Sequence, residues 1–290
     1  MVGFILGTGR CGSTLVHELV ARHPATGFVT NVDDLGLQRT NRRQVELWRQ
    51  LPAGVTTKGR VRFAPSEAYR AIAREVSPLL VDPAGDPGEH DLTPWLNERL
   101  HAFVDDRAAR IGLPVFVHKF TGWPRAGLLA AAFPEARFVH VVRDGRAVAS
   151  SWLQMPWWRG HLGPQGWHFG PLPTELDELW RQKGRSQPVL AGLGWRMLVD
   201  AHDRASADLG DRWLTVRYED LLRGPRAVLT GILEHLGLEW TDAFAAGVGR
   251  YQLREERTQA FRHDLGPRHV TDLDDVIGEH LRRHGYPAGT

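Results

Sequence analysis

The chain has 290 residues, of which 42% are hydrophobic and 24% charged, a balance typical of soluble globular proteins. Its 36 basic and 34 acidic residues nearly cancel and the basic ones form no tract, which excludes the basic footprint of a nucleic-acid-binding protein. Cys11 is the only cysteine, so an internal disulfide is excluded, and no stretch approaches the roughly 20 apolar residues that span a bilayer. These features predict a cytoplasmic protein without a membrane span.

Apolar runs and helical patterns alternate along most of the chain. A run at residues 2–6 closes at a glycine and is expected to be a buried strand, and apolar residues at helical spacing follow it. The further expected strands are 115–118, 137–142 and 213–216, and the expected helices are 14–22, 125–133, 146–152 and about 220–236. This alternation predicts an α/β fold, a P-loop-type parallel β-sheet flanked by helices.

Three segments are expected to interrupt this scaffold. They are residues 36–80, mostly helical, residues 82–94, a loop rich in Pro, Gly and acidic residues, and residues 155–173, an irregular excursion with several tryptophans. A last helix is expected at about 272–284, with Thr271 as its N-cap. The sequence shows no repeat, so we expect one domain over 1–290, with loop-rich or helical insertions at about 36–113 and 154–188.

A glycine-rich turn joins the first expected strand to the first expected helix. Its spacing resembles a Walker A loop, but Ser13 stands where that loop has its lysine, and a cation lies inside the loop at Arg10. Such a turn suits an anion yet lacks the lysine contact to the β- and γ-phosphates of a nucleoside triphosphate. The alternative is a plain glycine turn. The expected anion-binding residues are Gly9, Arg10, Cys11, Gly12, Ser13 and Thr14.

A second strand–turn–helix unit carries Arg143 at the end of the expected strand 137–142. Ligands bind at the carboxyl ends of strands in open α/β sheets. Ser151 follows eight residues later, about two helical turns into the next element, so the two side chains could hold one phosphate from two sides. A surface arginine and a buried serine are the alternative.

The ordered set of segments resembles the sulfotransferases that use 3′-phosphoadenosine-5′-phosphosulfate (PAPS), in their bacterial and tyrosylprotein-type branch. The glycine turn resembles their 5′-phosphosulfate loop, although Gly9 replaces a common proline and Cys11 a Ser or Thr. Four later segments complete the resemblance: residues 138–151 are similar to the 3′-phosphate site, 217–222 to the Tyr-Glu-Asp element, 118–119 to the lysine segment, and 261–262 to the start of a C-terminal cap.

This resemblance implies PAPS as co-substrate and no metal. It implies that Arg10 and the loop hold the 5′-phosphate and that Lys119 neutralises the transferring group. It further implies that Arg143 and Ser151 bind the 3′-phosphate, that Tyr218 lies near the adenine, and that Arg262 closes the site.

The general base is harder to place. An acceptor hydroxyl needs a carboxylate or histidine within hydrogen-bond reach, and the glutamate of the tyrosylprotein-type branch has no counterpart after His23. We expect Asp33 to be the base, with Asp34 second and His118 third. Capping of a helix near Leu35 is an equal alternative for Asp33.

Two other functions stay open at this point. A P-loop kinase would use Mg-ATP with Asp144 as its metal ligand, and a non-catalytic nucleotide-binding scaffold would need no base. The acceptor group is expected to be a hydroxyl or an amine, carried by a small molecule, a carbohydrate or a peptide. Trp157, Trp158 and Trp167 either line the acceptor pocket or pack their own loop.

Overall fold

The computed structural model describes residues 1–36, 39–53, 63–256 and 258–289. Its centre is a five-stranded sheet of order β2-β3-β1-β4-β5, and every strand pair in it is parallel. The strands are β1 (Val2–Leu6), β2 (Thr26–Phe28), β3 (Val115–Lys119), β4 (Arg137–Val142) and β5 (Trp213–Arg217). The predicted fold class, a parallel sheet flanked by helices, is confirmed.

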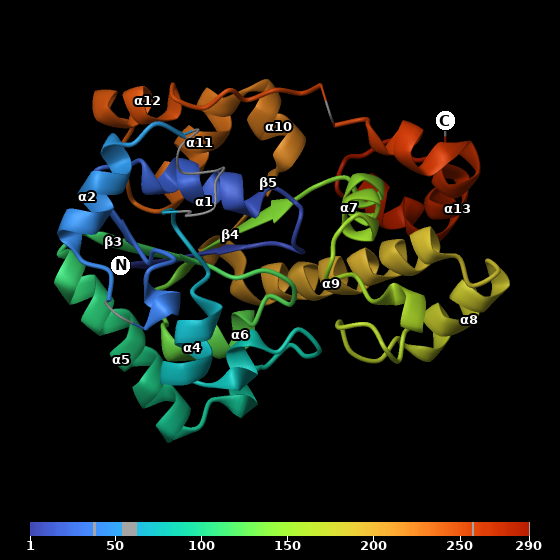
Figure 1. Ribbon diagram of the computed structural model, residues 1–290, viewed down its shortest axis with the longest axis horizontal. Coiled ribbons are helices and arrows are strands. Elements are labelled where there is room, and N and C mark those ends of the chain that lie inside the picture. Colours follow the sequence, from blue (N-terminus) through green and yellow to red (C-terminus); the bar gives the residue numbers. More distant parts are fainter. Residues whose placement is uncertain (37–38, 54–62, 257, 290) are drawn as a thin grey trace.

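Helices surround this sheet (Figure 1). They are α1 (Ser13–Ala21), α2 (Arg42–Gln50), α4 (Tyr69–Glu75), α5 (Pro94–Ile111), α6 (Ala126–Ala132), α7 (Gly145–Leu153), α8 (Thr174–Gln182), α9 (Gln187–Leu209), α10 (Tyr218–Arg223), α11 (Pro225–His235), α12 (Asp242–Val248) and α13 (Phe261–Arg283). Short 3-10 turns are η1 (Asp33–Leu35), η2 (Pro78–Val81), η3 (Glu89–Asp91), η4 (Gly160–Leu162) and η5 (Gly210–Arg212). Helices α7, α9 and α13 pack on one another at one end of the molecule, whereas α2, α4 and α5 lie at the other.

The middle of the sheet forms the core because its strands are apolar on both faces. In β1, Phe4, Ile5 and Leu6 are almost completely buried. The Phe4 ring stacks on that of Phe138 in β4, with 5.5 Å between centroids. Since β1 and β4 are parallel neighbours, the turns that follow them meet at the same edge of the sheet.

The structure corrects two expected helices. The helix expected at 220–236 is divided into α10 and α11 at Gly224, because Pro225 has no N–H to continue the first helix. The last helix begins at Phe261 and is interrupted at Gly266, whose φ of 76° is left-handed. Thr271 therefore lies inside α13, where its hydroxyl donates to the carbonyl of Pro267, and the N-cap prediction is wrong.

Other differences are additions. Strand β2 was not predicted, since three residues give no pattern, and neither was α9, the 23-residue helix that leads to β5. Residues 36–80 hold α2 and α4, as expected of a mostly helical segment, although 37–38 and 54–62 lie outside the described residues. None of the described helices has the length and apolar character needed to cross a membrane.

Candidate active site

The turn between β1 and α1 is built by left-handed backbone at Gly9, Arg10 and Gly12, with φ of 78°, 57° and 94°. Only glycine adopts such values without strain. At Gly12 there is also no room, because an added Cβ would lie 2.1 Å from the ring of Tyr218. The turn ends at the start of α1, where unpaired N–H groups and the helix dipole favour an anion.

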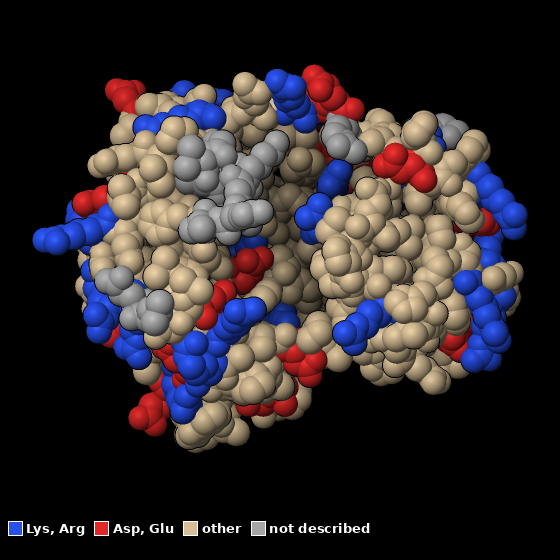
Figure 2. Space-filling model, viewed as in Figure 1, with Lys and Arg blue, Asp and Glu red and all other residues tan. Residues whose placement is uncertain are grey.

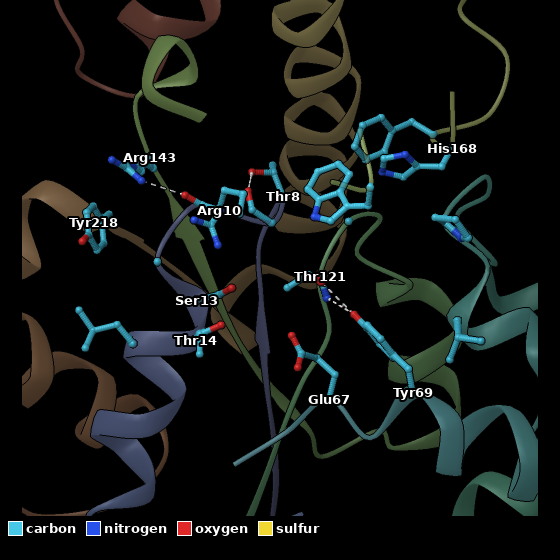
Figure 3. Close-up of a pocket in the computed structure, with 18 of the residues that line it drawn as sticks. Thr8, Arg10, Ser13, Thr14, Glu67, Tyr69, Thr121, Arg143, His168 and Tyr218 are labelled. Carbon is cyan, nitrogen blue, oxygen red and sulfur yellow. Dashed lines mark hydrogen bonds between the residues drawn. The ribbon is translucent and has the colours of Figure 1, made fainter. Parts of the chain in front are cut away.

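Four residues from three distant parts of the chain meet at this turn. Arg10 Nε donates a hydrogen bond to Ser151 Oγ at 3.0 Å, and Arg143 Nη1 donates to the Arg10 carbonyl at 3.0 Å. The Arg143 guanidinium lies 4.9 Å from the centroid of the Tyr218 ring. Figure 3 shows Arg10, Arg143 and Tyr218 together on one side of Ser13 and Thr14. The structure thus brings together four of the residues expected to hold the nucleotide, Arg10, Arg143, Ser151 and Tyr218.

Unused donors in this group fit a polyanion. The Nε of Arg143 is buried and has no hydrogen-bond partner among the described residues. Arg10 is exposed, and Nε is its only side-chain nitrogen with a hydrogen bond in the part of the chain that the structure describes. Two guanidinium groups with free donors beside the N-terminus of α1 match the phosphates of an adenosine 3′,5′-bisphosphate unit.

Lys119 lies at the end of β3, on the other side of the loop. Its Nζ donates to Thr14 Oγ1 at 2.6 Å and pairs with Glu67 Oε1 at 2.6 Å, and its side chain is only 1% exposed. Burial raises the pKa of Glu67, but the charge and hydrogen bond of Lys119 lower it, so that the pKa lies below its usual range. Glu67 is therefore an ionised carboxylate that faces the cavity at neutral pH (Figure 3).

Glu67 was missed by the sequence analysis because a non-local contact places it. An antiparallel bridge joins Thr30 to Pro65, and the N–H of Ser66 donates to the carbonyl of Val29 at 2.9 Å. These bonds hold the segment before α4 beside the chain that leaves β2. Glu67 follows this segment directly and reaches the carboxyl edge of the sheet. In the sequence, its position after a short extended segment was the one signal that could have indicated a place at the site.

The expected bases lie elsewhere. Asp33 is buried and pairs with Arg107 Nε at 2.8 Å, while its other oxygen accepts from Thr40, so its charge is balanced away from the cavity. Asp34 Oδ1 accepts from the N–H groups of Arg70 and Ala71 at the start of α4. Both carboxylates hold local structure, and neither lines the cavity.

Five further expected site residues are not among those that line the cavity. Cys11 belongs to the loop, and Lys119 and Ser151 bond to loop residues, whereas His118 and Arg262 lie away from it. His118 is buried, and burial lowers its pKa to about 4, with its ring 4.9 Å from that of Phe120. Arg262 is exposed on α13, and its Nε donates to Gln259 Oε1 at 3.0 Å. In this conformation Arg262 does not reach the loop.

The cavity itself has a volume of about 630 Å³. Figure 2 shows it as a deep hollow in the middle of the face, bordered by side chains of both charges. One side is formed by the loop with Arg143 and Tyr218, and the other begins at Glu67. The residues of that second side are Glu67, Tyr69, Val81, Pro83, Thr121, Gly122, Arg125, Trp157, His168 and Phe169.

The tryptophans of the excursion divide between two roles. Trp157 lines the cavity and is 40% exposed. Trp158 stacks on Trp152, with 6.2 Å between centroids, and Trp167 is buried against Phe169. Only Trp157 of the three therefore lines this cavity.

Asp144 does not suit the metal-binding role of the kinase alternative. It caps α7, and its two oxygens accept from the backbone N–H, Nε and Nη2 of Arg146 at 2.7 to 3.0 Å. Among the described residues, no group of three or more His, Cys, Asp or Glu side chains is placed to hold a metal ion.

Comparison with known proteins decides between the open alternatives. The model of the sulfotransferase family matches residues 4–242, most of the chain. The chain belongs to the sulfotransferase family. This membership makes it a transferase and confirms the predicted activity class over the kinase and scaffold alternatives.

Relatives of this sulfotransferase include mycobacterial proteins. The omega-hydroxy-beta-dihydromenaquinone-9 sulfotransferase Stf3 of Mycobacterium bovis is 25% identical, over 99% of this chain and 76% of that protein, and its Mycobacterium tuberculosis counterpart matches equally.

Solved structures that share the fold include two mycobacterial sulfotransferases. The sulfotransferase STF9 of Mycobacterium avium superposes with a TM-score of 0.58 at 16% identity, covering 98% of this chain and 77% of that one. STF1 of Mycobacterium tuberculosis H37Rv gives a TM-score of 0.50, also at 16% identity, over 91% and 76% of the two chains.

Proposed function

We propose that this sulfotransferase moves a sulfuryl group from PAPS to an acceptor hydroxyl by in-line displacement, with Glu67 as the general base. One observation carries the proposal: Lys119 Nζ lies 2.6 Å from both Thr14 Oγ1 of the phosphate loop and Glu67 Oε1. Because Lys119 contacts both the loop that would bind the donor and a carboxylate that could deprotonate the acceptor, we place the transferring sulfuryl group next to it.

The loop side binds the donor. The N–H groups from Cys11 to Thr14 and the guanidinium of Arg10 hold the 5′-phosphate, since they surround the start of α1. Arg143 and Ser151 hold the 3′-phosphate, and Tyr218 supports the adenine. PAPS supplies the sulfuryl group, and its sulfur–oxygen bond to the 5′-phosphate breaks as the bond to the acceptor oxygen forms.

Lys119 acts on the transferring sulfuryl group, and Glu67 acts on the acceptor. Lys119 stabilises the negative charge that builds up on the sulfuryl oxygens and the leaving phosphate. Glu67 takes the proton of the acceptor hydroxyl, and its ionised state at neutral pH makes it ready to do so. Arg262 bonds to Gln259 instead of to a loop residue and is given no role in this mechanism.

The finer assignments are also proposals. The His118–Lys119 segment at the end of β3 supports the bacterial and tyrosylprotein-type branch, and the single cysteine supports a cytoplasmic location. Among small molecules, carbohydrates and peptides, we favour a small-molecule acceptor, because the mycobacterial relative is named for a hydroxylated dihydromenaquinone.

Transfer of ³⁵S from labelled PAPS to a mixed panel of hydroxyl acceptors tests the function. Arg10→Ala is expected to abolish transfer while the thermal unfolding midpoint stays within a few degrees of the wild type. The control is Arg42→Ala, since Arg42 is an exposed arginine that pairs with Glu46 on α2. Full activity in the Arg10 variant would refute the assignment of the loop.

A further inference from the structure

The second side of the cavity carries aromatic and aliphatic side chains. Beyond Glu67 it passes between two walls, one from the segment around α4 and η2 and one from the excursion after α7. The first wall presents Tyr69, Val81 and Pro83, and the second presents Trp157, His168 and Phe169. The rings of Trp157 and His168 meet edge to face, with 4.8 Å between centroids.

The polar groups on this side are mostly bonded to the protein itself. The hydroxyl of Tyr69 accepts from the N–H of Thr121 and shares a hydrogen bond with its hydroxyl, both at 2.9 Å. Arg125 gives its two terminal nitrogens to the carbonyls of Thr121, Trp123 and Asp82, so that only its buried Nε lacks a partner among the described residues. An acceptor with many hydroxyls would find few partners here.

His168 adds a polar tip without adding charge. Burial lowers its pKa, and the nearby positive charge of Arg159 lowers it further. The imidazole is therefore neutral at physiological pH and presents a flat ring to the cavity.

A second cavity of about 400 Å³ shares Pro83, Trp157 and His168 with the first, and adds Pro156, Trp167 and Arg159. The side chains of Pro83, Trp157 and His168 therefore border both cavities. The two cavities also give a reason for the 40% exposure of Trp157, which an extended ligand would cover.

We infer that the acceptor is an elongated, uncharged apolar alcohol. Its hydroxyl lies at Glu67, its body runs along Trp157 and His168, and its far end reaches the second cavity. A short alcohol would fill only the part nearest Glu67, whereas a long one would bury Trp157 and Pro83. This inference rests on the proposed sulfuryl transfer and names the substrate class of the same site.

Linear primary alcohols from butanol to decanol test the inference, with ³⁵S transfer as the readout. Each added methylene contributes about 0.8 kcal/mol, so kcat/KM is expected to rise roughly fourfold per carbon until the chain fills the groove. In Trp157→Ala the gain from the longer chains is lost. Trp95→Ala is the matched control, because Trp95 is an exposed tryptophan of α5 outside both cavities.

A binding measurement keeps the inference separate from the reaction. Titration of the alcohols, followed by the change in tryptophan fluorescence with adenosine 3′,5′-bisphosphate present, is expected to give a far lower Kd for decanol than for butanol. This difference is expected in the wild type and in Trp95→Ala, but not in Trp157→Ala. Three results would overturn the inference and leave the proposed sulfuryl transfer intact. They are equal Kd values for the two alcohols, the wild-type rise of kcat/KM with chain length in Trp157→Ala, and preferred transfer to a hexose. Tight decanol binding without transfer to any acceptor would support the groove and contradict the proposed function.

Discussion

Replacement of Glu67 and of Asp33 by their amides separates catalysis from stability in this site. Glu67→Gln removes the base but keeps a side-chain oxygen that can accept from Lys119, and the Glu67 side chain is 28% exposed. The buried Lys119 loses its charged partner but keeps two acceptors, the amide oxygen and Thr14 Oγ1. We therefore expect a smaller loss of stability than for a fully buried pair, and a fall in kcat of about 10²- to 10⁴-fold, the usual contribution of a general base.

Asp33→Asn has the opposite expected effect. Asp33 is fully buried against Arg107, and loss of one partner of such a pair costs about 3–5 kcal/mol. Arg107 keeps Glu75 as a second partner at 3.0 Å, so we take the lower end, about 3 kcal/mol. For a chain of this size that lowers the unfolding midpoint by roughly 6 °C, while kcat at 25 °C stays near the wild-type value.

Calorimetry and ³⁵S transfer on the two variants form the assay, together with the pH profile of kcat. Because the pKa of Glu67 is depressed, its basic form prevails at neutral pH, and activity falls only on acidification through that pKa. The acidic limb should be absent from Glu67→Gln. Loss of activity in Asp33→Asn with full activity in Glu67→Gln would refute the reasoning.

Three further predictions concern the glycine turn, the nucleotide contact of Arg143 and the buried His118. Gly12→Ala should abolish binding of adenosine 3′,5′-bisphosphate, because its Cβ would meet the Tyr218 ring at 2.1 Å; unchanged affinity in a titration would contradict this. Arg143→Ala should weaken the binding of adenosine 3′,5′-bisphosphate about 10- to 100-fold in a calorimetric titration, because a charged hydrogen-bonding partner contributes about 1.5–3 kcal/mol. Arg137→Ala is the control, since Arg137 is the exposed first residue of β4 and its loss should leave the affinity unchanged. The free energy of unfolding should decrease as the pH is lowered from 6.5 to 4, because burial lowers the pKa of His118 to about 4 and the unfolded chain takes up its proton first. In urea unfolding, His118→Phe should reduce the slope of this free energy against pH by up to about 1.4 kcal/mol per pH unit. An unchanged slope would count against a neutral His118.

Local pattern was sufficient for the scaffold and the donor side. Apolar runs identify β1, β3, β4 and β5, and a parallel sheet brings the turns after β1 and β4 to one edge. For this reason the sequence alone predicts that Arg10 and Arg143, 133 positions apart, lie near one another, and the hydrogen bond from Arg143 to the Arg10 carbonyl places them so.

The acceptor side depends on contacts that no local pattern records. Glu67 owes its place to the bridge between Thr30 and Pro65, and Asp33 is withdrawn from the cavity by Arg107, 74 positions away. A carboxylate in a short connecting segment looks the same in the sequence whether it faces a cavity or a buried arginine. The distinction arises only when the helices pack.

The most direct test of the central claim is thermal unfolding with nucleotides present. We predict that adenosine 3′,5′-bisphosphate raises the unfolding midpoint without magnesium, with a stabilisation near 2.7 kcal/mol at 100 times its Kd, and that ATP has little effect. Stabilisation by Mg-ATP with none by the bisphosphate would contradict the account.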